Sequence, residues 1–169
     1  GRRAMASSAA RAAPASGILT LGDIDVAQVR ALLARHGLGL VRVGDGAAIP
    51  GSYWGAPEAG VIAHEVFARA DTPVHSLLHE ACHLIVAPAH RRALIHTDAS
   101  DSQAEEDAAC YLQVLLADEL GGVGRTRLMA DMDTWGYSFR LGSARAWFER
   151  DADDSRAWLA ARDLLPAGG

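Results

Sequence analysis

The sequence predicts a single α+β domain that is mostly helical, with a small β-sheet beside a buried central helix. Three observations lead to this prediction. Apolar residues recur at helical spacing over residues 71–87 and again over 102–120. Residues 125–165 are also mostly helical in pattern. By contrast, only two short runs, 38–43 and 61–67, carry the β-branched residues and alternation of strands.

Composition is that of one folded domain. The chain has 169 residues, of which 50% are hydrophobic and 22% charged, so it can build a sizeable core. Its net charge is −5, which disfavours binding to nucleic acid or to an anionic membrane surface. No apolar run approaches the roughly 18 residues that a membrane-spanning helix needs. We therefore expect a cytoplasmic protein that binds neither nucleic acid nor membranes.

The N-terminal segment differs from the rest of the chain. Residues 1–22 contain no acidic residue and are rich in Ala, Arg and Ser, without the compact apolar core of a secretion signal. We expect a disordered extension there and the folded domain over 23–169. The two cysteines, Cys82 and Cys110, fall in separate predicted helices. So few cysteines in a chain of this size indicate buried, reduced thiols and no disulfide framework.

A helix and two strands are expected before the central helix. Asp23 or Asp25 can cap the first helix, and Gly37 ends it in the usual C-terminal role. The run 38–43 predicts one strand and 61–67 a second, which we expect to pair with the first.

The central helix contains the pattern H-E-x-x-H. Thr72 can cap it, and Pro73 fits the first helical position. His79 and His83 are four residues apart, so both imidazoles lie on one face of the helix. Two such rings can bind one divalent metal ion, and Glu80 can reach a water on that metal. Burial of these three ionisable side chains is costly unless something pairs with them, and a metal ion would do so.

A catalytic metal usually keeps three protein ligands and one open position. The longer pattern H-E-x-x-H-x-x-G-x-x-H is excluded as the source of the third ligand, because Val86 and Ala89 occupy the positions of its glycine and last histidine. The helix that follows offers three carboxylates instead: Glu105, Glu106 and Asp107.

Helical periodicity favours Glu105 among these carboxylates. The residues one, two and three turns beyond it are apolar or small: Ala108, Ala109, Leu112 and Leu116. The same spacing beyond Glu106 meets the polar Gln113. Ser102 and Glu105 also match a capping box, in which Glu105 would bond only to backbone. We expect the histidine pair and Glu105 to be the metal ligands, with Glu106 as the alternative.

The motif at 79–83 and the run 105–112 resemble the gluzincin-like metallopeptidases, in particular the small single-domain type with a strand pair leading into the H-E-x-x-H helix. The similarity covers roughly residues 38–120, and its Glu-x-x-Ala run is similar to the helix that supplies the third ligand in those families. Ala109 stands where such families often carry a polar residue that orients a ligand. The resemblance implies a zincin-like fold, bound Zn²⁺, and hydrolysis of peptide or amide bonds in a peptide or protein substrate, with Glu80 as the base.

The segment 75–92 is also similar to the bacterial elongation factor P hydroxylases, in which an H-E-x-x-H segment is closely followed by an arginine pair, here Arg91 and Arg92. That resemblance implies Fe²⁺ and hydroxylation of a protein side chain. Two histidines and one carboxylate are also the ligand set of non-haem iron oxygenases, so spacing alone leaves the metal open.

A third possibility is a structural metal closed by a fourth protein ligand, for which Asp107, His75 and Cys110 are candidates. Tyr137 and Arg140 are candidates for stabilising the oxyanion that develops during hydrolysis.

Overall fold

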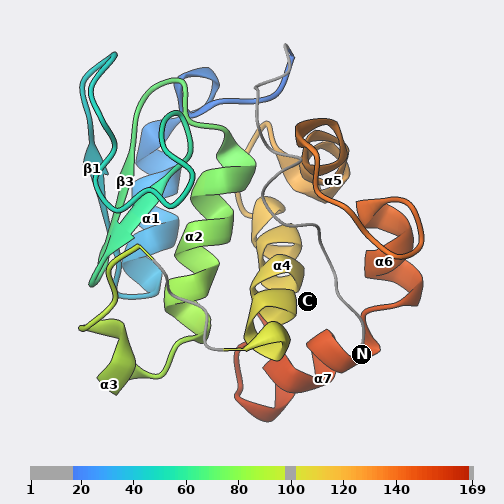
Figure 1. Cartoon of the computed structure of the whole chain (residues 1–169). Helices are drawn as coiled ribbons and strands as arrows, with labels where there is room; N and C mark the ends of the chain where they lie inside the picture. The colour runs from blue at the N-terminus through green and yellow to red at the C-terminus, as the bar shows by residue number, and fades with distance from the viewer. Residues whose placement is uncertain (1–16, 98–101, 168–169) are drawn as a thin grey trace.

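The computed structural model describes residues 17–97 and 102–167 (Figure 1). These residues form an α+β fold with a small three-stranded sheet, as the sequence predicted. None of the helices within these two ranges combines the length and apolar character that a membrane crossing needs.

Strands occur only in the first half of the described chain, and the second half is built from helices and loops. In chain order the elements are the 3-10 turn η2 (Leu21–Asp23), α1 (Val26–Arg35), β1 (Gly39–Arg42), β2 (Gly60–Ile62), β3 (Glu65–Ala68), α2 (Val74–Val86), α3 (Ala89–Arg92), α4 (Gln103–Ala117), α5 (Gly124–Trp135), α6 (Ala144–Arg150) and α7 (Asp153–Ala161).

The folded domain begins earlier than predicted. Ile18 and Leu21 are buried in the core, and the Leu21 N–H donates to the Thr72 carbonyl at 2.9 Å. Residues 17–22 therefore belong to the domain and not to a disordered extension. Ile18, Leu19 and Leu21 follow an Ala-rich stretch and are too few to form a periodic pattern, which is why the sequence did not reveal them. Residues 1–16 of the expected extension lie outside the described residues.

The start and end of α1 agree with the prediction. The Asp25 carboxylate accepts a hydrogen bond from the Ala27 N–H at 2.9 Å, as an N-cap should. Gly37 follows the helix with φ of 74°, a left-handed conformation that glycine adopts without strain.

The second predicted strand is a hairpin. β2 and β3 pair antiparallel, and β3 also pairs parallel with β1, so β3 is the middle strand. The chain turns at Ala63, whose φ is 51°. The run 61–67 lacks Gly, Pro, Asn and Asp, the residues that usually mark a turn, so the sequence concealed it. The expected pairing of the 61–67 segment with 38–43 is confirmed through β3.

Helix α2 is the most enclosed element. Every residue in it is buried except Glu80, which is half-buried. It contacts β2 and β3 on one side and α4 and α5 on the other, and Figure 1 shows it between the sheet and α4. The helix begins at Val74, so Pro73 lies just before the first helical position. The predicted cap, Thr72, does not cap the helix, and its hydroxyl accepts instead from the Arg69 N–H at 2.9 Å.

Helix α4 packs against α2, α5 and α7. All its residues from Ala108 to Ala117 are buried, so it has no solvent-facing side over this length. The three C-terminal helices agree with the helical pattern of residues 125–165, and Trp135 and Trp147 are buried among them.

Truncation within α2 should cost far more stability than truncation in a surface loop. Leu78→Ala, at a fully buried site, should lower the free energy of unfolding by about 2–5 kcal/mol because it leaves a cavity. Leu94→Ala, at a side chain that is 83% exposed, should change it by no more than about 0.5 kcal/mol. Urea denaturation of both variants measures the difference, and equal losses would contradict this packing.

Candidate metal centre

Three side chains from two helices meet in the structure. The His79 and His83 Nε2 atoms from α2 lie 3.0 Å apart. The two Glu106 carboxylate oxygens from α4 lie 3.2 Å from His79 Nε2 and 2.8 Å from His83 Nε2. Within residues 17–97 and 102–167, no other group of three or more His, Cys, Asp or Glu side chains brings its ligand atoms this close together.

These separations fit a divalent metal ion. Zinc bonds of about 2.0–2.1 Å in tetrahedral geometry place their donor atoms about 3.3–3.4 Å from one another. The observed separations of 2.8–3.2 Å are slightly shorter than this. A small adjustment of side-chain torsions would therefore accommodate the ion. Two imidazole nitrogens and one carboxylate also leave a position open for water or substrate.

The carboxylate in this cluster is Glu106, the predicted alternative, and Glu105, the preferred candidate, lies outside the cluster. Glu105 points to Arg91 on α3, with which it forms two parallel hydrogen bonds of 2.5 and 3.1 Å. The Ser102 hydroxyl caps α4 by accepting from the Glu105 N–H, so that half of the expected capping box is present.

The sequence prediction assumed that α4 has one buried side and one exposed side. Its middle is buried on all sides, so apolar residues do not identify the side that faces α2. That side is marked by Gln113, which lies two turns beyond Glu106 and is fully buried. Gln113, a polar residue in an otherwise apolar stretch of helix, was therefore the sequence signal for this side. The prediction counted it as evidence against Glu106, although both residues lie on the side that faces α2.

Gln113 is the buried polar neighbour of His79 that sequence reasoning missed. Its Oε1 atom lies 2.7 Å from His79 Nδ1, on the opposite side of that ring from the metal cluster. Its Nε2–H donates to the His75 carbonyl at 3.0 Å. Gln113 therefore supplies the outer contact that metal-binding histidines usually make.

Electrostatics keep the Glu106 carboxyl ionised. Burial by itself would raise the pKa of the Glu106 carboxyl, but the charges and hydrogen bonds of His79 and His83 outweigh it and hold that pKa well below its usual value. Both cysteines are buried thiols, as predicted. Burial, and secondarily the Glu80 charge, raise the pKa of the Cys82 thiol, which keeps it in the protonated form that binds metals poorly.

Glu80 lies on α2 between the two histidines of the cluster. It does not belong to the group of converging ligand atoms, and it is the only residue of α2 that is not buried. It precedes His83 by three residues, so the two side chains lie on neighbouring parts of the same helix surface.

The candidate fourth ligands and the candidate groups for stabilising an oxyanion do not belong to the cluster. None of His75, Asp107 and Cys110 belongs to the cluster. His75 Nδ1 lies 3.2 Å from the Tyr137 hydroxyl, and the Tyr137 ring lies edge-on to the His79 ring at 6.0 Å between centroids. Arg140 is exposed and pairs with Asp151, away from the cluster.

The arginine pair has structural contacts. The Arg92 guanidinium donates to the carbonyls of Leu84 and Ile85 near the end of α2, at 2.7 and 3.4 Å. These carbonyls have no partner within a helix that ends at Val86. Arg92 therefore caps the motif helix, while Arg91 joins α3 to the first turn of α4.

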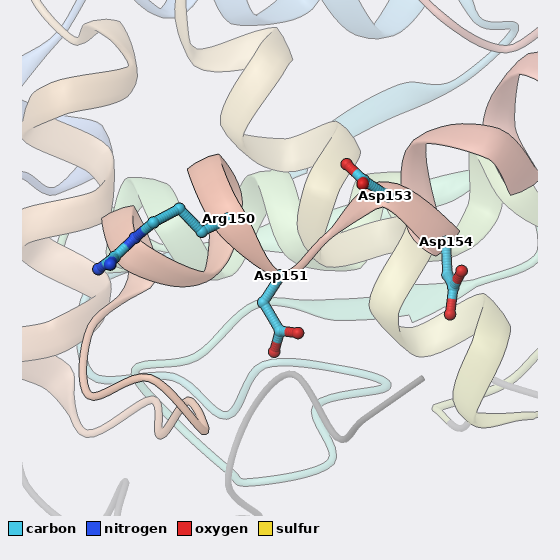
Figure 2. A pocket seen from close by; sticks show the side chains of 4 residues that line it. All are labelled: Arg150, Asp151, Asp153 and Asp154. Atoms are coloured by element: carbon cyan, nitrogen blue, oxygen red, sulfur yellow. The ribbon is translucent and has the colours of Figure 1, made fainter.

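A polar hollow lies where α6 meets α7, lined by Arg150, Asp151, Asp153 and Asp154. Figure 2 shows that Asp153 extends away from Asp151 and Asp154. Because their carboxylates diverge, this hollow does not assemble a cation site.

Comparison with known proteins yields no relative: no protein-family model, curated protein or solved structure matches the chain. The chemistry of the cluster is therefore the basis for any functional conclusion.

The two adjacent glutamates should differ sharply in their effect on metal binding. Glu106→Gln removes a direct ligand charge and should weaken zinc affinity by more than about 100-fold, since loss of an outer contact alone costs about 10–100-fold. Glu105→Gln should leave zinc affinity close to that of wild type, because Glu105 contacts Arg91. Competition with a chromophoric chelator measures both, and the reverse order of effects would contradict the observed geometry.

Proposed function

We propose that this protein is a metal-dependent hydrolase of peptide or amide bonds, with zinc as the metal. The observation that carries the proposal is the convergence of His79, His83 and Glu106, with Glu80 beside them on the same helix. The resemblance of residues 79–83 to the motif of gluzincin-like metallopeptidases supports the same reaction.

In this proposal each residue has a defined task. His79, His83 and Glu106 would hold the metal. Bound zinc would supply a Lewis acid that polarises a carbonyl and makes a water molecule acidic near neutral pH. Glu80 accepts a proton from the attacking water and then delivers it to the leaving amine.

The differing exposure of the ligands supports one direction of approach to the centre. The side chains of His79 and His83 are 3% and 7% exposed, whereas that of Glu106 is 19% exposed. A substrate carbonyl would therefore enter past Glu106 and the first turns of α4. We propose a peptide or protein segment as the substrate, because a flexible chain can present one carbonyl at a recessed site.

The same ligand set supports a second candidate, an iron-dependent hydroxylase acting on a protein side chain. The favouring observation is that one carboxylate and two imidazoles meet without a thiolate among them. Iron in the purified protein and oxygen consumption without proteolysis would support this function over hydrolysis.

Replacement of Glu80 should separate metal binding from catalysis. Glu80→Gln should keep zinc affinity close to wild type, because Glu80 is not among the converging ligands, and should lower the hydrolysis rate by about 10²–10⁴-fold. The measurement is cleavage of a diverse peptide mixture, followed by mass spectrometry, and then kinetics on one cleaved peptide. Glu149→Gln, at an exposed ion pair on α6, is the matched control and should retain full activity. Full activity in Glu80→Gln would refute the proposed role of Glu80.

A further inference from the structure

Gln113 makes two hydrogen bonds in a place without access to solvent. It is fully buried on α4, between the His75 carbonyl at 3.0 Å and the His79 imidazole at 2.7 Å, both on α2. Its amide therefore links two successive turns of the motif helix.

The chemistry of the partners fixes which way this amide points. A backbone carbonyl can only accept hydrogen bonds, so the NH₂ group of Gln113 must face His75. Its carbonyl oxygen then faces His79 Nδ1 and can only accept from it. His79 must therefore carry a hydrogen on Nδ1. A flipped amide would place two acceptors against each other at the His75 carbonyl, so the alternative orientation is disfavoured.

We propose that Gln113 is a positioning residue that holds His79 in the Nδ1–H tautomer, so that the lone pair of Nε2 is directed at Glu106 and His83. This inference deepens the proposed metal site and rests on it for its purpose, although the tautomer itself is a property of the chain. Without Gln113, His79 could place its hydrogen on Nε2 and so block its own ligand atom.

The inference also explains why a neutral amide stands at this position. A carboxylate there would accept from His79 equally well, but its second oxygen would face the His75 carbonyl at about 3 Å, acceptor against acceptor. An amide satisfies both partners at once. Gln113 thus both accepts from His79 and donates to His75, whereas an ionised carboxylate could only accept.

Three variants test this role. Gln113→Leu removes both hydrogen bonds with similar bulk, and Gln113→Glu keeps an acceptor for His79 while losing the donor to His75. Ser76→Ala is the matched control: Ser76 is also fully buried on α2, and its hydroxyl accepts from the Ala59 N–H and donates to the Glu58 carboxylate, neither of which belongs to the cluster. Each full-length protein is titrated with Zn²⁺ alone in competition with a chelator.

We expect Gln113→Leu to raise the zinc dissociation constant by about 10–100-fold. Gln113→Glu should bind more tightly than Gln113→Leu, and Ser76→Ala should bind as wild type does. A wild-type dissociation constant in Gln113→Leu would overturn the inference. So would an equal loss in Ser76→Ala, because it would show that any buried defect in α2 weakens the site.

The hydrogen on Nδ1 is read directly by nitrogen-15 NMR of the histidine rings in metal-free wild-type protein. A hydrogen on His79 Nδ1 is the expected result, whether or not Nε2 also carries one in the absence of metal. An Nδ1 atom without a hydrogen would overturn the inference even if the variants fail to fold. If wild type binds no zinc, the proposed function fails, while this NMR measurement still decides the role of Gln113.

Discussion

The antiparallel packing of α2 against α4 is the constraint on which the rest of the structure depends. Early residues of α2 lie beside late residues of α4, as the pairs His75–Gln113 and His83–Glu106 show. Strands β2 and β3 of the sheet pack against the other side of α2, and α5 and α7 pack against α4 (Figure 1). Both helices are thereby held so closely that polar side chains on their shared face must satisfy one another.

Two kinds of polar contact occupy that face, and they are coupled. At one level Gln113 bonds to both His75 and His79, and about two turns away Glu106 meets the histidine pair. A buried carboxylate facing imidazole lone pairs is stable only when protons or a cation lie between them. The shared face therefore favours positive charge between Glu106 and the two histidines. The neutral amide of Gln113 contributes no charge to it.

The motif residues and most helices were predictable from the sequence because each depends on short-range spacing. Four-residue spacing placed His79 and His83 together, and the capping residues Asp25 and Ser102 marked true helix starts. The α+β class followed from the same patterns.

What the sequence did not reveal depends on contacts between distant segments. Glu105 and Glu106 are neighbours on α4, so a rotation of the helix by one residue about its axis would exchange the carboxylate that faces α2. The helices packed around α4 and the ion pair between Arg91 and Glu105 fix that rotation. The turn at Ala63 uses a residue with no turn preference, and the burial of Leu21 requires the Thr72 carbonyl as partner. The role of Gln113 appears only when α2 lies opposite.

X-ray absorption spectroscopy at the metal edge, on protein purified without added metal, tests the central claim most directly. We expect about one zinc per chain, bound by two imidazole nitrogens and carboxylate oxygen at about 2.0–2.2 Å, with no sulfur bound to the metal. Sulfur scattering near about 2.3 Å would instead place Cys82 or Cys110 at the metal. That result, or no bound metal even after incubation with zinc, would contradict a centre made of His79, His83 and Glu106.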